Sequence, residues 1–387
     1  MKRVILPKRT QWEKEHQKIG FDYFNLPSED GSIYWSEGVA YEFHLTHIEQ
    51  LEDAANELHQ MCLDLVQDMI TRGNYPAYFQ LPNAAISCIE HTWKTNAPML
   101  YGRFDVAYDG HNIKMLEYNA DTPTGLLEAS VAQWLWLEQV SSIPHRDQFN
   151  HIHEALIERW QTLYSPNTTI HFAACQSAGR EDWGNLEYLM DTAFQAGLNV
   201  SELSMDNIGW NHQHFVDLNH QVIQHLFKLY PWEWIWEENF SKYIQPPHMQ
   251  WIEPCWKMLL SNKALLVSLW QRFPNHPLLL ETHAYHPQHS YAGKWVRKPI
   301  LAREGANIHI LQDSIDRGKA SGSFYFKDYD KHGYVAQRWV DTPLHQGMLP
   351  TLGLWMVGHQ CKGMSIREDA CTIIGNDAHF VPHYFIE

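Results

Sequence analysis

Residues 101–121, YGRFDVAYDGHNIKMLEYNAD, restrict the fold of this chain more than any other segment. Two alternating runs flank an Asp-Gly turn signal, which predicts a β-hairpin. Side chains in a strand alternate between faces, so Arg103 and Asp105 share one face of the first strand. Glu117 and Asn119 share one face of the second strand. A half-buried hairpin normally carries apolar residues at such positions, so these polar side chains require a partner or a function.

The register of the hairpin decides whether the two polar faces coincide. A three-residue loop that ends at Asn112, with this asparagine in the left-handed conformation, would place Asp105 opposite Glu117. The same register would place Arg103 opposite Asn119. Opposed carboxylates destabilise a sheet unless a cation compensates them. Two interpretations follow: Arg103 neutralises both acids in a salt-bridged hairpin, or the carboxylates and the Asn119 amide oxygen bind Mg²⁺. The polar turn after Asn119 precedes a predicted helix, whose N-terminus would attract anions and so favours the second interpretation.

The composition is that of a folded protein with room for two or three subdomains, because 44% of its 387 residues are hydrophobic and 19% are charged. A net charge of −16 argues against nucleic acid as a partner, since phosphate neutralisation needs a surplus of Lys and Arg. No segment has the roughly 20 consecutive apolar residues of a membrane span, and no signal sequence is recognisable, so we expect no membrane partner and a cytoplasmic location. The six cysteines lack C-x-x-C spacing, and we expect reduced thiols.

Hydrophobic periodicity divides the chain into a helix-rich beginning and a β-rich end. Residues 46–73 carry apolar side chains at three-to-four spacing, which predicts a helix that begins with a Thr46/Glu49 capping box and ends at Gly73. The order strand, helix, strand in TIHFAACQ, LEYLMDTAFQAG and LNVSELSMD predicts a small α/β lobe. KWVRKPILAREGANIHIL, SFYFKDYD, GYVAQRWV and LGLWMVGHQ predict antiparallel strands.

These patterns suggest four regions. We expect a helix-rich segment that packs on the core at 1–100, the hairpin and a helix at 101–165, the small α/β lobe at 166–252, and a β-rich region at 253–387. The histidine-rich run within the third region shows no shared metal-ligand spacing, which favours a polar helix surface over a metal site; its histidines are His212, His214, His220 and His225.

A basic, glycine-containing stretch in the last region suggests phosphate binding. Lys298 lies in a predicted strand, and residues 303–307, Arg-Glu-Gly-Ala-Asn, form a bend after it. Backbone N–H groups beside a lysine can cover a triphosphate. The chain lacks both the GxxxxGK[ST] and the GxGxxG patterns, so a nucleotide would have to bind between sheets.

Six motifs in order carry a resemblance to a known family: GRFD, LEYNAD, EPCWKMLLSNKALL, VRKPILAREGANI, AQRW and GMSIRED. Together they resemble the synthetase domain of glutathionylspermidine and trypanothione synthases, which belong to the ATP-grasp superfamily. The resemblance covers most of the chain from about Tyr101 onward. Bifunctional relatives also carry an amidase domain, whereas this chain is similar to the free-standing, acid–amine ligase branch. The resemblance implies a mixed α and β ATP-grasp fold, with a nucleotide held between antiparallel sheets and an α/β pre-ATP-grasp-like lobe.

The resemblance also implies a reaction and a set of site residues. An acid–amine ligase forms a carbon–nitrogen bond: ATP phosphorylates a carboxylate, and an amine then attacks the acyl phosphate. Mg²⁺, with two ions expected, would be held by Asp105, Glu117 and Asn119. Arg103 and Arg367 would stabilise charge on the reacting groups. The residues implied to bind ATP are Arg103, Lys263, Lys298, Glu304, Gly305, Ala336, Gln337, Arg338 and Trp339, the last four through backbone groups at the adenine edge. On pattern alone, Arg367 would instead form a surface ion pair with Glu368 or Asp369.

The substrates implied are a small carboxylate, either a peptide or an amino acid, and an amine such as a polyamine. Thr122 stands where the family contacts its thiol peptide through a serine, and Lys228-Leu229-Tyr230-Pro231-Trp232 lacks a family hydroxyl, which argues against glutathione. Acidic and aromatic side chains could receive an amine cation, although core aromatics and solvated acids account for them equally well; they are Glu181, Asp182, Trp232, Glu233, Trp234 and Trp236. Alternatives to a ligase are a small-molecule kinase and a catalytically silent binding protein. The sequence does not specify an oligomeric state.

Overall fold

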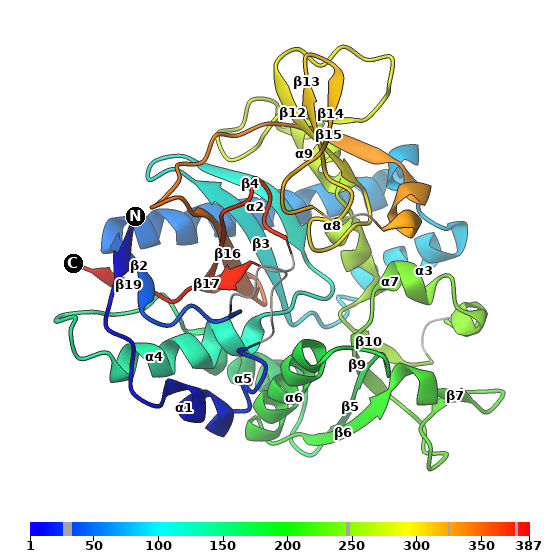
Figure 1. Ribbon diagram of the computed structural model, residues 1–387. Coiled ribbons are helices and arrows are strands. Elements are labelled where there is room, and N and C mark those ends of the chain that lie inside the picture. The colour runs from blue at the N-terminus through cyan, green and yellow to red at the C-terminus, as the bar shows by residue number, and fades with distance from the viewer. Residues whose placement is uncertain (26–32, 245–247, 324–325, 376–377) are drawn as a thin grey trace.

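The computed structural model describes residues 1–25, 33–244, 248–323, 326–375 and 378–387. Helices and strands are mixed along the chain, and the strands form several separate sheets, which confirms the predicted mixed α and β class (Figure 1). Two five-stranded antiparallel sheets and a four-stranded parallel sheet account for most of the strands in this described part. No helix within it combines the length and the apolar character that crossing a membrane requires.

The first five-stranded sheet contains the predicted hairpin. Its strand order is β18-β17-β16-β3-β4, and every neighbouring pair is antiparallel. The strands are β3 (Tyr101–Tyr108), β4 (Ile113–Asn119), β16 (Leu349–Val357), β17 (Gln360–Asp369) and β18 (His379–Phe380). The sheet therefore joins the hairpin to strands about 250 residues later, and the predicted strands LGLWMVGHQ and GMSIRED are confirmed as β16 and β17.

A long helix, α2 (Leu45–Arg72), packs against this sheet and buries one apolar stripe in the main core. The predicted end is confirmed, because Gly73 takes the left-handed conformation with φ of 60°. The predicted capping box is wrong. His44 is the N-cap residue and no side chain caps the helix, so Thr46 lies inside the first turn. Strand β2 (Val39–His44) runs directly into the helix, so the pairing of this strand, rather than a cap, fixes where the helix begins.

The second five-stranded sheet has the order β11-β15-β12-β13-β14 and is antiparallel throughout. Its strands are β11 (Thr282–Ala284), β12 (Lys294–Pro299), β13 (His309–Gln312), β14 (Ile315–Lys319) and β15 (Tyr334–Arg338). The predicted strand SFYFKDYD includes residues 324–325, which lie outside the described residues. Its described end is instead a 3-10 helix, η6 (Lys327–His332). An ion pair of 2.8 Å between Lys331 and Asp328, three residues apart, favours a helical turn there.

The four-stranded parallel sheet, of order β10-β9-β5-β6, confirms the predicted small α/β lobe. It is built from β5 (Thr169–Ala174), β6 (Asn199–Ser204), β9 (His225–Leu229) and β10 (Gln250–Ile252). Helix α6 (Arg180–Gln195) connects β5 to β6 and is followed by Gly197 at φ of 86°. Helix α5 (Ile152–Leu163) packs against α6.

The histidine-rich run does not form a helix, so that prediction is wrong. It contains a two-stranded ribbon of β7 (Gly209–Trp210) and β8 (Phe215–Val216), and His225 begins β9. The side chains of Asn211 and Asp217 accept hydrogen bonds from backbone amides two to four residues later. Such local bonds stabilise turns in competition with a helix.

A three-stranded sheet brings the two ends of the chain together. Strand β2 (Val39–His44) lies between β1 (Lys2–Ile5) and the parallel β19 (His383–Ile386), and Figure 1 shows both termini at this sheet. All six cysteines are free thiols. The other helices and helical turns are α1 (Trp12–Lys18), η1 (Ala77–Phe79), α3 (Asn83–Lys94), η2 (Glu128–Ala132), α4 (Gln133–Gln139), η3 (Met205–Asn207), α7 (Trp232–Ile235), η4 (Asn239–Tyr243), η5 (Cys255–Lys257), α8 (Met258–Ser261) and α9 (Ala264–Arg272).

Candidate active site

A cavity of about 870 Å³ lies between the two five-stranded sheets. Its walls come from β3, β4, β16 and β17 of the first sheet, from β12 and β15 of the second, and from the first turn of α6. This volume is within the range of small-molecule sites. The residues that the resemblance implies as catalytic, metal-binding or ATP-binding line this cavity, with the exception of Ala336, and so do Thr122, Glu181 and Asp182. Of the other side chains considered for the amine, Trp234 lines it, whereas Trp232, Glu233 and Trp236 do not.

The hairpin has the predicted register at its polar end. Asp105 is paired with Glu117, and Arg103 with Asn119. The loop is not the predicted one: it spans residues 109–112, and a bulge opposite the Asp105/Val106 step compensates for the additional residue. Gly110 at φ of 100°, rather than Asn112, takes the left-handed conformation. The Asp109 carboxylate accepts from the amides of His111 and Asn112, which stabilises this wider turn.

The four polar side chains of the hairpin contact one another. Arg103 forms a two-pronged ion pair with Asp105, at 2.6 Å from Nε and 3.0 Å from Nη2. The Asn119 amide donates to Asp105 at 3.1 Å and to Glu117 at 3.2 Å. Glu117 has a different cation, since Lys263 Nζ lies 3.0 Å from its Oε2. The interpretation in which Arg103 neutralises both acids is therefore wrong, because each carboxylate has its own partner.

Two lysines place positive charge beside Glu117. Burial opposes ionisation of Glu117, but the ammonium groups of Lys263 and Lys298 outweigh it and lower the pKa of this carboxyl to about 2. Burial lowers the pKa of Lys298 to about 8, with Glu117 favouring the charged form. Lys298 donates to the side-chain oxygen of Gln337 at 2.7 Å, and Lys263 donates to the Ala302 carbonyl at 2.6 Å. The Glu117 carboxylate is thus ionised at neutral pH and lies between cations that could bind phosphates.

The donor set of the hairpin fits Mg²⁺. Two carboxylates and an amide offer only oxygen ligands, which this ion prefers, and Mg²⁺ commonly takes its remaining ligands from water and phosphates. Among the residues that the structure describes, no group of three or more His, Cys, Asp or Glu side chains is arranged to hold a metal ion. Any ion at Asp105 and Glu117 would therefore need Asn119 or a bound phosphate to complete its shell.

Arg367 reaches the cavity from β17. Its guanidinium lies 5.9 Å from the centre of the Tyr34 ring and donates to the carbonyls of Gly375 and Ala378, both at 3.2 Å. The alternative of a surface ion pair with Glu368 is wrong. Glu368 is fully buried and pairs with Arg3 at 2.8 Å, since neighbouring side chains of a strand point to opposite faces.

The predicted adenine strand is β15, and its residues differ in their access to the cavity. Gln337, Arg338 and Trp339 line the cavity, whereas Ala336 is fully buried between β11 and β12. The amide of Arg338 donates to the Glu281 carbonyl, and that of Trp339 to Lys294. Lys294 Nζ also lies 3.4 Å from the centre of the Trp339 ring. Gln337, Arg338 and Trp339 therefore border the cavity, while the amides of Arg338 and Trp339 are already used in backbone hydrogen bonds.

The loop after β12 closes over the same cavity. Glu304 and Gly305 line it, and Gly305 has φ of 69° with the Ile374 carbonyl oxygen only 2.9 Å from where a Cβ would lie. Arg303, which the sequence did not single out as a site residue, donates to the Thr122 hydroxyl at 2.6 Å and to the Glu233 carboxylate at 3.2 Å. The Thr122 position is thus an anchor for this loop.

A second group of carboxylates lines the cavity beside α6. Glu181 and Asp182 belong to the first turn of that helix, and Glu304 faces them from the loop after β12. Burial, followed by the charges of Glu181 and Glu304, raises the pKa of Asp182 to about 6. Burial and Glu181 likewise raise the pKa of Glu304. These acids repel one another, and the charges of Arg303 and Arg367 offset that repulsion only in part.

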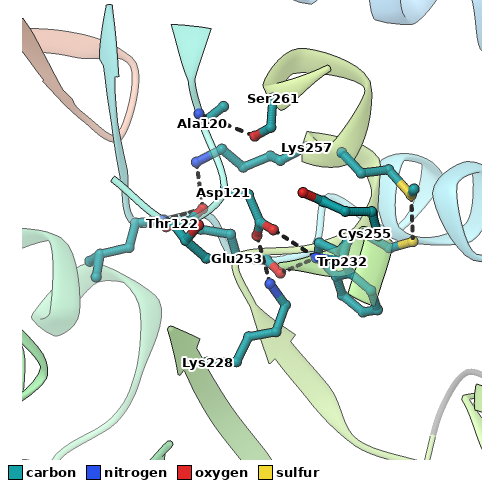
Figure 2. A network of polar contacts seen from close by, with 12 residues as sticks. Ala120, Asp121, Thr122, Lys228, Trp232, Glu253, Cys255, Lys257 and Ser261 are labelled. Atoms are coloured by element: carbon teal, nitrogen blue, oxygen red, sulfur yellow. Dashed lines mark hydrogen bonds and ion pairs between the residues drawn. The ribbon is translucent and has the colours of Figure 1, made fainter. Parts of the chain in front are cut away.

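Lys228 is a buried structural residue and does not line the cavity. Figure 2 shows its ammonium against Asp121, at 2.6 Å, and both side chains are almost fully excluded from solvent. Asp121 also accepts from the Trp232 amide at 3.0 Å. Trp232 is fully buried, so among the predicted tryptophans only Trp234 lines the cavity. The expected aromatic surface for an amine is therefore reduced to one ring.

Sequence reasoning missed Tyr34 and Glu128. Tyr34 lines the cavity, and its hydroxyl donates to Glu128 Oε1 at 2.9 Å. Tyr23 donates to Oε2 of the same carboxylate at 3.3 Å. No local pattern marks these residues, because the tyrosines come from an N-terminal segment and Glu128 from a turn of helix after the hairpin.

Comparisons with known proteins agree with the architecture. A family model described as glutathionylspermidine synthase preATP-grasp matches residues 3–386. The chain is 50% identical to a candidate acid–amine ligase of Haemophilus influenzae over 395 residues, covering 100% of both chains. It is 25% identical to trypanothione synthetase of Crithidia fasciculata, over 94% of this chain and 58% of that one. It is 24% identical to the bifunctional glutathionylspermidine synthetase/amidase of Escherichia coli, over 86% of this chain and 57% of that one.

The chain thus spans the whole of the first relative and little more than half of the other two. Among solved structures, a glutathione synthetase-like effector of Globodera pallida has the same overall fold, with a TM-score of 0.60 at 8% identity, covering 99% of this chain and 100% of that one. The family match extends over nearly every residue, and the chain belongs to the glutathionylspermidine synthase preATP-grasp family.

Proposed function

We propose that this protein is an ATP- and Mg²⁺-dependent acid–amine ligase that forms an amide through an acyl phosphate, with an ATP-grasp arrangement in which the nucleotide lies between the two five-stranded sheets. One observation carries the proposal: a single cavity is lined by the carboxylates and the amide of the hairpin, by several cationic side chains and by a separate set of carboxylates. A metal-bound triphosphate needs the hairpin face and the cations, a reacting carboxylate needs cations, and an ammonium group needs carboxylates. An ATP-dependent reaction also fits the cytoplasmic location expected from the sequence.

The hairpin and the two basic strands would hold the nucleotide. Bound Mg²⁺ would neutralise phosphate charge, with Asp105, Glu117 and Asn119 as its protein ligands. Lys263 and Lys298 are placed to contact phosphate oxygens once Glu117 is compensated by the metal. The side chains of Gln337, Arg338 and Trp339 would face the purine.

Two arginines would act on the reacting atoms. Burial opposes the charged form of Arg103, but the ion pair with Asp105 outweighs it and raises the pKa of the guanidinium, so Arg103 stays charged. Arg367 enters the cavity from the neighbouring part of the same sheet. Guanidinium groups fixed in a water-poor site stabilise negative charge that grows on a transferred phosphoryl group and on the oxygen of a tetrahedral intermediate.

The carboxylates beside α6 would bind the amine substrate as its ammonium ion. Glu181, Asp182 and Glu304 repel one another in the free protein, and a cation among them would relieve that repulsion. Trp234 offers one aromatic face nearby. An amine with more than one positive charge, such as a polyamine, suits this site better than a monoamine. Thr122 is engaged by Arg303, so the acid would contact it only through a rearranged loop.

The test is a paired substrate screen. The purified protein with ATP and Mg²⁺ is given amino acids and short peptides, glutathione included, in combination with polyamines and other amines. ADP release and product masses equal to both substrates minus water are measured. We expect ADP release only when both partners are present. A phosphorylated product formed without an amine would establish a kinase instead, and ATP binding without turnover for any pair would indicate a catalytically silent binding protein.

A further inference from the structure

A buried carboxylate lies directly behind the cavity wall that Tyr34 forms. Glu128 is completely excluded from solvent and does not line the cavity. The Tyr34 side chain separates the two, because it lines the cavity and donates to Glu128 Oε1 at 2.9 Å. The second carboxylate oxygen of Glu128 accepts a hydrogen bond from the Tyr23 hydroxyl at 3.3 Å. Among the residues described, Tyr34 is thus the cavity-lining side chain that hydrogen-bonds to this carboxylate.

The direction of these hydrogen bonds limits what Tyr34 can offer a ligand. A phenol has one donor hydrogen and acceptor lone pairs, and Tyr34 uses its hydrogen toward Glu128. Only acceptor capacity therefore remains for the cavity, and the partner it suits is an N–H group. An incoming ammonium or amine is such a partner, whereas phosphates and carboxylates are not.

The charged groups around the pair act in opposite senses, since Glu181 favours a cationic ligand and the Arg367 guanidinium opposes one. Glu181, in the first turn of α6, acts on both Glu128 and Tyr34, and Arg367 of β17 faces the Tyr34 ring at 5.9 Å. The neighbouring Tyr23 is uncharged. Burial, followed by the Glu181 charge, raises the pKa of Glu128 to about 7. A carboxyl with such a pKa accepts and releases a proton near neutral pH.

We propose that the Tyr34–Glu128 pair accepts a proton from the ammonium substrate, which must lose this proton before its nitrogen can attack the acyl phosphate. This inference rests on the ligase function proposed above. The ammonium passes a proton to the Tyr34 oxygen while the phenol proton moves to the Glu128 carboxylate. The products are a neutral amine, an intact phenol and a carboxylic acid. The amine then forms the C–N bond, the bond from acyl carbon to phosphate oxygen breaks, and the departing phosphate takes the second N–H proton. Glu128 releases its proton once the product has left.

The experiment compares two nucleophiles in three variants. Tyr34→Phe removes the relay, Glu128→Gln keeps a hydrogen-bond acceptor but cannot take a proton, and Tyr23→Phe is the matched control, since Tyr23 contacts the same carboxylate without lining the cavity. Each is assayed with the acid found in the wild-type screen and either spermidine, whose nitrogens are ammonium groups at pH 7.5, or hydroxylamine, which is already neutral. Folding is checked by thermal unfolding.

We expect Tyr34→Phe and Glu128→Gln to lose about 100-fold or more in kcat with spermidine, the size of a general-base contribution. The rate with hydroxylamine, which yields a hydroxamate, should stay within about threefold of wild type in these two variants. The rates of Tyr23→Phe should stay within about threefold of wild type with either nucleophile. The decline of the wild-type rate with spermidine as pH falls below about 7 should disappear in Glu128→Gln. Equal losses with the two nucleophiles, or no loss with either, would show a merely structural role and overturn the proposal. Absence of any product in the wild type would instead reject the ligase function itself, and this inference with it.

A binding measurement tests the same pair without turnover. Calorimetry of spermidine binding at pH 7 in two buffers of different ionisation enthalpy reports protons released. An ammonium ion beside Tyr34 favours the ionised form of Glu128, so wild type should release more protons than Glu128→Gln. Equal release by the two proteins contradicts the proposed contact.

Discussion

At the scale of single residues, Asp105 and Glu117 are held in register on adjacent strands and each has its own cation. Changing Asp105→Asn together with Glu117→Gln preserves side-chain size and removes both charges. We expect turnover of Mg·ATP to fall by about 100-fold or more, because preorganised electrostatic contacts at a reacting centre commonly contribute that much each. The assay is ADP release with the substrate pair from the screen, alongside circular dichroism.

The matched control for that double variant is Glu202→Gln, which changes an exposed carboxylate on β6. It should turn over ATP like the wild type. If the double variant keeps its activity while it binds and releases nucleotide normally, the assignment of the metal to this hairpin is wrong.

Single residues also show where sequence reasoning succeeds. The pairing of Asp105 with Glu117 could be predicted, since strand alternation and an Asp-Gly turn are local signals. The length of the loop could not be predicted. The bulge compensates for one additional loop residue, and the alternation of side chains near the turn does not reveal it. Tyr34 gave no signal at all. Its role depends on a partner, Glu128, that is 94 positions away.

At the scale of elements, the turn after β4 is tied to the parallel lobe by a buried ion pair (Figure 2). Replacing Lys228→Met leaves the Asp121 carboxylate buried without its cation. We expect the free energy of unfolding to fall by about 3–5 kcal/mol, the usual cost of breaking one side of a buried pair. Urea titration followed by tryptophan fluorescence measures it.

The double variant Asp121→Asn with Lys228→Met serves as the control for this substitution. It removes both charges and should recover a substantial part of the lost stability. A double variant no more stable than Lys228→Met alone would mean that side-chain packing, and not the unpaired charge, causes the loss.

Elements with a strong local pattern were predicted correctly, and those shaped by side-chain bonds were not. The α/β order of β5, α6 and β6 follows from periodicity and from Gly197. The histidine-rich run has no periodic apolar pattern. Hydrogen bonds from nearby backbone amides to the side chains of Asn211 and Asp217 therefore determine its structure. Propensity and polarity alone do not show which of these local bonds form.

At the scale of the whole molecule, His16, His59 and His383 are among the buried histidines, and they lie in different parts of the core. Burial lowers the pKa of each to about 3. The unfolded chain therefore binds more protons than the folded one between about pH 3 and 6.5, and stability should fall as pH drops through that window. Glu128 acts in the opposite sense, because its raised pKa adds stability below about 7, and the raised pKa values of Asp182, Glu253 and Glu304 act in the same direction. The lowered pKa values of Glu37 and Glu117 add to the effect of the histidines.

The measurement is the urea midpoint at pH 7.5 and at pH 5. We expect a lower midpoint at pH 5 in the wild type, and a smaller difference between the two pH values in His59→Gln. His212→Gln, at an exposed turn, should leave that difference unchanged. An unaltered pH dependence in His59→Gln would show that this ring is not held neutral by burial.

The way in which the strands assemble into sheets could be predicted only from the family resemblance that the six ordered motifs carry. Local sequence patterns predict both the first strand of the hairpin and a strand near the end of the chain. No local pattern shows that these two strands, β3 and β16, pair with each other. That pairing creates the polar face with Arg103 on one strand and Arg367 two strands away. The cation partners of the acids, Lys263 and Lys298, likewise meet Glu117 only in the folded chain.

The sheet that joins the two ends of the chain has a consequence for the order of assembly during synthesis. Strand β2 needs β19 as its parallel neighbour, and Trp35 pairs with Phe380 next to it. Tyr34 therefore cannot settle into the cavity wall until residues near position 380 have left the ribosome. The wall that is translated first is completed last, after the strands β3, β4, β12 and β15 that line the rest of the cavity have been synthesised.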